Sequence, residues 1–213
     1  MPVQRRWTND SVLNIAPNGD PVLVITSRAQ QLVTKALDEG WTGPPFDPFR
    51  LADLLGIQLR TNTELLDVRL VLYENKPCIE FNPDRPRGRL RYSIAHEIAH
   101  TLFPDWHAAV RNRMKTSEAR GSQAELESLC NVAAAEILMP LGTLGDLRSE
   151  DMSIARLLQL QRDLDVSTEA LFIRIAQVSE FPCAMLVARA DDVGTWMVEY
   201  AITAANFAFR ATR

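Results

Sequence analysis

The feature that most constrains this chain is a five-residue motif, His96-Glu97-Ile98-Ala99-His100, which has the pattern HExxH. It contains two of the chain's three histidines. On an α-helix, positions i and i+4 lie one above the other, so both imidazoles can reach one metal ion. Glu97 lies about 100° round the same helix, beside the open position of the metal. The motif therefore predicts a catalytic zinc site, with His96 and His100 as ligands and Glu97 as the catalytic base.

A catalytic zinc ion normally has three protein ligands, so a third ligand must come from another part of the chain. The remaining histidine, His107, lies beyond Pro104 and would have to fold back from a loop. A stronger source is the segment of residues 125–140, which is rich in alanine, ends at a proline and predicts a helix. The third ligand is therefore sought among the glutamates of that segment.

Helical phase separates these glutamates, because each residue turns the helix by about 100°. Glu127 and Asn131 fall on one face, whereas Glu125 and Glu136 point to roughly the opposite side. The pair forms Glu-x-x-x-Asn, which resembles the Glu-x-x-x-Asp of gluzincin peptidases. That resemblance implies that Glu127 binds zinc and that Asn131, one turn later, orients a ligand histidine by accepting its N–H. The alternative is a solvated Glu127 and a buried amide at Asn131.

Together the two motifs resemble the ImmA/IrrE family of bacterial metallo-endopeptidases. The matching residues are Arg91-Tyr92-Ser93-Ile94-Ala95-His96-Glu97, then Glu127-x-x-Cys130-Asn131 leading into Ala134-Ala135-Glu136-Ile137-Leu138-Met139-Pro140. Weaker likeness extends the match to about residues 45–200. The resemblance implies a zinc-dependent endopeptidase whose partner is a helix-turn-helix transcriptional repressor. Cleavage of that repressor would switch on the genes of a stress-response, mobile-element or antiphage system.

The order of the expected elements predicts an α+β fold with a zincin-like peptidase core. Asn18-Gly19 between two short apolar runs, residues 12–15 and 22–25, is typical of a hairpin turn. Helices are expected from Ser27 to Gly40, and after a cap at Asp47. Strands are expected at residues 58–61, 69–73 and 78–81, and they form a small sheet against the HExxH helix. An edge of this sheet over the metal could hold an extended peptide by strand addition.

The rest of the chain predicts a helix pair at residues 154–161 and 168–178, which looks like a helix-turn-helix, and a β-hairpin at residues 184–189 and 195–202. The expected organisation is therefore a metallopeptidase core with an N-terminal extension over 1–140, a helical subdomain over 141–180, and a hairpin over 181–213 that either pairs with the core or begins a sensor domain. Residues 153–177 hold three basic and three acidic side chains. A helix that docks on phosphates usually has a positive excess, so this balance favours a packing role.

Charge is uneven along the chain. Residues 84–120 carry eight basic and four acidic side chains, whereas the whole chain has a net charge of −4. This positive stretch borders both expected metal-binding helices and could steer an acidic substrate or a nucleic-acid trigger to the site. Its alternative is an ordinary solvated helix start and loop. The arginines concerned are Arg85, Arg87, Arg89, Arg111 and Arg113.

Three cysteines, Cys78, Cys130 and Cys183, are an odd number without the spacing of a metal site. Reduced, buried thiols are therefore expected, and Cys183 or Cys78 could lie over the zinc as an inhibitory ligand. With no signal-peptide pattern and no membrane-length apolar run, we expect a cytoplasmic protein without a membrane partner.

Two further questions are left open by the sequence. Tyr92 and His107 are the candidates for an oxyanion stabiliser, although Tyr92, one turn before the motif, also fits a core position. The rival function is a nucleic-acid-responsive regulatory protein whose zinc is mainly structural.

Overall fold

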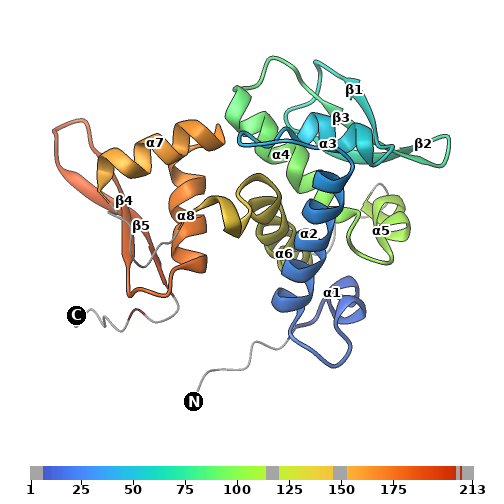
Figure 1. Ribbon diagram of the computed structural model, residues 1–213, viewed down its shortest axis with the longest axis horizontal. Coiled ribbons are helices and arrows are strands. Elements are labelled where there is room, and N and C mark those ends of the chain that lie inside the picture. The colour runs from blue at the N-terminus through green and yellow to red at the C-terminus, as the bar shows by residue number, and fades with distance from the viewer. Residues whose placement is uncertain (1–6, 114–119, 146–152, 205–206, 208–213) are drawn as a thin grey trace. The chain divides into compact units, whose positions relative to one another are not determined.

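The computed structural model describes residues 7–113, 120–145, 153–204 and 207. The chain divides into two compact units, residues 1–140 and 141–213, and each is described by itself. The first unit contains α1 (Asp10–Ile15), α2 (Pro21–Asp38), α3 (Pro48–Leu54), β1 (Gln58–Thr61), β2 (Arg69–Tyr73), β3 (Lys76–Phe81), α4 (Arg87–His100), α5 (Trp106–Arg113) and α6 (Arg120–Leu138) (Figure 1). The second contains a 3-10 turn (Leu141–Thr143), α7 (Ile154–Leu164), α8 (Thr168–Val178), β4 (Ala184–Ala190) and β5 (Trp196–Thr203).

The hairpin predicted around Asn18-Gly19 is wrong, because both flanking segments are helical. Helix α2 begins at Pro21, six residues before the expected cap, because the side chain of Asp20 accepts the Val22 N–H and proline fits the first helical position. Asn9 caps α1 in the same way. The apolar residues of α2 that are buried recur at helical spacing: Ile25, Ala29, Val33 and Ala36.

The three predicted strands are confirmed, and they form a sheet in the order β1-β3-β2. Strand β1 pairs with β3 in parallel, and β2 pairs with β3 antiparallel. The β2–β3 turn is the pair Glu74-Asn75, whose positive φ angles of 50° and 61° suit a tight hairpin turn. Strand β2 therefore lies at one edge of the sheet, and its Leu70 is buried.

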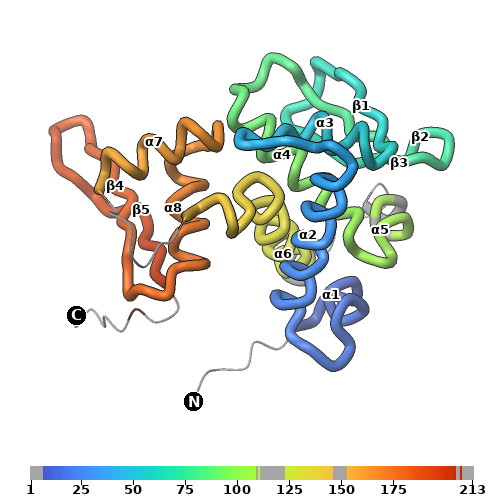
Figure 2. Tube along the Cα trace, in the orientation of Figure 1, coloured from blue at the N-terminus to red at the C-terminus, as the bar shows by residue number. Residues whose placement is uncertain are grey.

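Helix α4 lies between this sheet and helix α6, since it contacts β2 and β3 on one side and α6 on the other. Helix α6 also packs along α2, as the course of the chain shows (Figure 2). The buried residues at this junction include Ile25, Ala29, Ala99, Leu129 and Cys130. The packing holds α4 and α6 side by side, with the HExxH motif in the last turns of α4.

In the second unit, helices α7 and α8 are joined by a short turn, with Asp165 in the left-handed conformation and Ser167 capping α8. Strands β4 and β5 form the predicted antiparallel hairpin, which contacts α8. The α+β class, the small three-stranded sheet and the C-terminal hairpin are thus confirmed. Across the described part of the chain, no helix is both long enough and apolar enough to cross a membrane.

Candidate metal centre

Helix α4 presents the HExxH motif because its apolar residues point the opposite way. Ile94 and Ile98 are fully buried, and the helix ends at His100, before Pro104. This arrangement turns His96 towards α6 and leaves it partly exposed, whereas His100 is buried. The two imidazole rings lie 5.0 Å apart, centroid to centroid.

Both imidazoles direct Nε2 towards the same carboxylate oxygen of α6. Glu127 Oε2 lies 2.8 Å from Nε2 of His96 and 3.6 Å from Nε2 of His100. Gln123, one turn earlier on α6, donates a hydrogen bond of 2.7 Å to the other carboxylate oxygen of Glu127. Two imidazole nitrogens and one carboxylate oxygen are the donor set of a catalytic zinc site, so these residues fit that metal.

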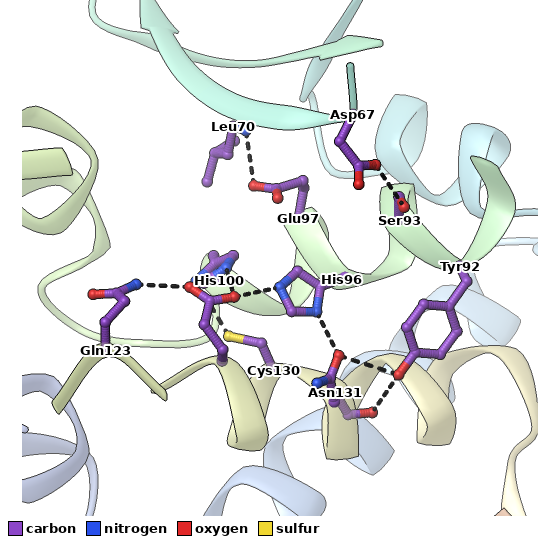
Figure 3. Close-up of polar contacts among 11 residues, drawn as sticks. Asp67, Leu70, Tyr92, Ser93, His96, Glu97, His100, Gln123, Cys130 and Asn131 are labelled. Carbon is purple, nitrogen blue, oxygen red and sulfur yellow. Dashed lines mark hydrogen bonds and ion pairs between the residues drawn. The ribbon is translucent and has the colours of Figure 1, made fainter. Parts of the chain in front are cut away.

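The second nitrogen of each ring also has a partner on α6 (Figure 3). Nδ1 of His96 lies 2.9 Å from Asn131 Oδ1, and Nδ1 of His100 lies 3.2 Å from Cys130 Sγ. The sequence predicts the contact of Asn131 but treats Cys130 as a buried apolar residue. The signal for Cys130 was its position three residues after Glu127, which places it on the same helix face.

The other two glutamates of α6 lie elsewhere. Glu125 holds the start of the described chain, since its carboxylate accepts hydrogen bonds from the Thr8 and Asn9 N–H groups at 2.7 and 2.8 Å. Glu136 is buried, with an exposed fraction of 2%. Neither lies among the residues that line the pocket beside the histidines.

Glu97 is buried beside the three converging donors, and it is held by the sheet. Its Oε2 accepts a hydrogen bond of 2.8 Å from the backbone N–H of Leu70, on the edge strand β2. Sequence patterns cannot reveal this contact, because a backbone N–H is present at every residue except proline. The bond fixes the carboxylate between the sheet and the histidines, as Figure 3 shows.

The charge state of His96 follows from its surroundings. Burial acts to lower the pKa of His96, but the hydrogen bond to Glu127, the charges of Glu97 and Glu127 and the contact with Asn131 together raise it above its ordinary value of 6.5. Both ring nitrogens face oxygen acceptors, and only an imidazolium can donate to both. Without a metal, His96 therefore favours its protonated form.

A pocket of about 310 Å³ opens beside this group. Its lining residues are Asp67, Val68, Tyr92, Ser93, His96, Glu97, Glu127 and Asn131. The Tyr92 hydroxyl donates to Asn131 Oδ1 at 3.2 Å, and burial, with a smaller effect of Cys130, raises the pKa of Tyr92 to about 12. Tyr92 is thus a protonated donor on the pocket wall. His107 stacks on Trp106 and is not among the lining residues.

Asp67 was not predicted, because it lies in the loop before β2 without a motif. Burial acts to raise the pKa of Asp67, but hydrogen bonds from Val68, Arg89 and Ser93 outweigh it and lower the pKa. Arg89 forms an ion pair with Asp67 at 3.0 Å, so one of the predicted steering arginines is engaged at the pocket rim. Arg85 donates to the Leu66 carbonyl.

The remaining predicted residues fall into three groups. Arg87 begins α4, and the side chains of Arg111 and Arg113 lie outside the described residues. Cys78 is fully buried in β3 and does not line the pocket. Cys183 belongs to the second unit, so the prediction for it stays a prediction. Within the described part of the first unit, Cys130 is the thiol that contacts a predicted ligand.

Comparison with known proteins identifies the motif-bearing region. Residues 52–176 match the family described as the IrrE N-terminal-like domain. The chain is 31% identical over 112 residues to the radiation response metalloprotease IrrE of Deinococcus deserti, a match that covers 50% of this chain and 39% of that relative. The fold is similar to that of a Mycobacterium tuberculosis transcriptional regulator, with a TM-score of 0.58 and 16% identity over 93% of this chain and 59% of the other.

Proposed function

The chain belongs to the IrrE N-terminal-like domain family, and from this premise we propose that it is a zinc-dependent endopeptidase that cleaves a protein partner. The observation that carries the proposal is the meeting of His96 Nε2, His100 Nε2 and Glu127 Oε2 at one point, with Glu97 beside them and a pocket in front. A structural zinc site normally has four protein ligands, whereas three ligands beside a pocket favour catalysis.

His96, His100 and Glu127 would hold the ion, with Asn131 orienting His96. When bound there, zinc supplies a Lewis acid that activates water and polarises a carbonyl group. Glu97 then acts as the base: its carboxylate takes a proton from the attacking water and gives it to the leaving amine nitrogen. The Leu70 N–H keeps the carboxylate in place during both transfers.

Tyr92 is the better of the two oxyanion candidates. It lines the pocket, and the raised pKa keeps its hydroxyl protonated near neutral pH. In the structure this hydroxyl donates to Asn131. A donor that is already held near the reacting carbonyl can stabilise developing negative charge, so a small rotation would let Tyr92 serve the oxyanion.

The substrate would bind as an extended segment along β2. This strand is the edge of the sheet order β1-β3-β2, and its Leu70 reaches the catalytic carboxylate. A peptide that adds to an exposed edge gains main-chain hydrogen bonds and passes the pocket in an extended form. The partner itself, a helix-turn-helix repressor, is proposed from the resemblance of the two motifs to the ImmA/IrrE family.

The test compares wild type with Glu97→Gln. Both proteins are loaded with zinc and incubated with the helix-turn-helix repressor encoded nearest to the gene of this chain, and new chain ends are identified by mass spectrometry. Glu97→Gln should keep its zinc and cleave at least roughly 10²-fold more slowly, because a general base contributes about that much or more. Wild-type protein stripped by a chelator is the second control.

Cleavage by Glu97→Gln at the wild-type rate would remove Glu97 from the mechanism. The rival function, a nucleic-acid-responsive regulator with structural zinc, predicts no cleavage by either protein and equal binding of nucleic acid by both. In α8, Arg174 is buried, which leaves that helix without an exposed basic side chain and favours the peptidase.

A further inference from the structure

Helix α6 gives each histidine of the motif its own partner. Glu127, Cys130 and Asn131 occupy positions i, i+3 and i+4, and they face α4 together. Asn131 contacts Nδ1 of His96, Cys130 contacts Nδ1 of His100, and Glu127 lies opposite both Nε2 atoms. The thiol therefore occupies, for His100, the place that the amide occupies for His96.

Two arrangements of Cys130 are sterically available. Nitrogens of His96 and His100 lie within 4.8 Å of each other and of Cys130 Sγ, so the thiolate could itself be a ligand. One imidazole presents one lone pair to a metal, however, and Nε2 of His100 already faces Glu127. If a metal were bound by Cys130 and by Nδ1 of His100, the nitrogen of His100 that binds the metal would point away from the Glu127 carboxylate. Because Glu127 Oε2 lies near Nε2 of both histidines, the arrangement favours metal binding through Nε2.

We propose that Cys130 is a positioning residue for His100: its Sγ accepts the Nδ1–H, which leaves the lone pair of Nε2 directed at the metal. The proposal rests on the proposed zinc site. His100 is 4% exposed and Cys130 fully buried, so water has little access to replace the thiol as acceptor. Sulfur is a weak acceptor, yet a buried N–H without any acceptor is costly, and the contact therefore selects one tautomer.

The experiment measures zinc affinity by competition with a chelator for wild type, Cys130→Ala, Cys130→Ser and Cys78→Ala. Cys130→Ala should bind zinc about 10-fold more weakly, at the lower end of the range for partners of ligand histidines. Cys130→Ser should recover most of this loss, because a hydroxyl oxygen also accepts an N–H. Cys78→Ala is the matched control: it removes another fully buried thiol, in β3, and should leave zinc affinity unchanged.

Equal zinc affinity of Cys130→Ala and wild type would overturn the proposal. So would a loss in Cys130→Ser as large as that in Cys130→Ala, because it would show that the acceptor role does not matter. Should Cys130→Ala fail to fold, a measurement on the wild-type protein alone still decides. In zinc-loaded wild type, nitrogen NMR should show a protonated Nδ1 in His100, and a protonated Nε2 would contradict the assignment.

A second measurement separates a partner from a ligand. Cobalt(II) is substituted for zinc, and the absorption spectrum is recorded, because a thiolate bound to cobalt gives an intense charge-transfer band in the near ultraviolet. Wild type should lack the band. A band that disappears in Cys130→Ser would make Cys130 a ligand and overturn the proposal. None of these readouts measures cleavage, so failure of the peptidase function would be recognised separately, in the comparison with Glu97→Gln.

Discussion

The two histidines of one motif lie in different surroundings. His96 has a side chain 15% exposed, lines the pocket and contacts Asn131, whereas the His100 side chain is 5% exposed and contacts Cys130 within the core. We refer to these as the cleft side and the core side of the site. One turn of helix thus separates a histidine that lines the pocket from a histidine that is packed in the core. The core side should control stability, and the cleft side should control protonation.

Glu127 contacts a histidine on each side, so its replacement should have the largest effect on zinc affinity. Glu127→Ala removes the oxygen that both Nε2 atoms share, and zinc affinity should fall by more than the roughly 100-fold that loss of a partner of a ligand can cause. Zinc retention against a chelator measures this.

Glu125→Ala is the matched control for that change, two residues away on the same helix. It removes the acceptor of the Thr8 and Asn9 N–H groups, so it should reduce stability by about 1 kcal/mol and leave zinc in place. Glu136→Ala should also keep zinc. Loss of zinc from either control, with retention in Glu127→Ala, would show that the third ligand has been misassigned.

The next test compares the two sides directly, through the stability of the metal-free protein. His100→Ala leaves a cavity in the core and removes the contact with the Cys130 thiol, and should reduce the free energy of unfolding by about 2 to 4 kcal/mol. His96→Ala removes a partly exposed ring and should cost about 1 kcal/mol or less. Chemical denaturation of both variants in the presence of a chelator gives the two values. Equal losses would mean that the core side and the cleft side do not differ energetically.

This difference between the two sides is where prediction from sequence was incomplete. Helical spacing predicts two pairs, His96 with His100 and Glu127 with Asn131. The resemblance to gluzincin peptidases assigns both pairs to one site, and in the structure their side chains lie together. Phase on a helix can be read from the chain alone, because the turn per residue is constant. Which histidine is buried depends on how α4, α6 and α2 pack, and the spacing of the motif does not contain that information.

The sequence also does not predict two contacts between segments that are distant in the chain, because neither depends on a motif. The Leu70 N–H is a backbone group, and Asp67 lies in a loop whose course only the folded sheet defines. Helices that have both an N-cap residue and buried residues along one face were predicted well, such as α3 after Asp47 and α8 after Ser167. The turn at Asn18-Gly19 was misread, since these residues favour a turn between helices as readily as between strands, and the cap at Asp20 decided it.

The smallest expected effect is the pH dependence of the cleft side. Because the folded pKa of His96 is raised above 6.5, its protonation stabilises the metal-free protein fully below pH 6.5, and this stability is lost as pH rises through the folded pKa. The slope cannot exceed that of one proton, about 1.4 kcal/mol per pH unit. Zinc affinity should change in the opposite direction, rising with pH over the same window, since the ion must displace that proton.

Glu97→Gln sharpens this last prediction, because it removes a negative charge that raises the pKa of His96 while leaving the three zinc donors in place. The midpoint of the rise in zinc affinity should therefore move to lower pH in Glu97→Gln. Glu80→Gln, a charge change on β3 away from the pocket, is the control and should leave the midpoint where it is. Competition with a chelator at a series of pH values measures all three proteins. A midpoint that does not move in Glu97→Gln would show that the carboxylates of the cleft do not set the protonation of His96. The cleft side and the core side would then not differ in their electrostatics.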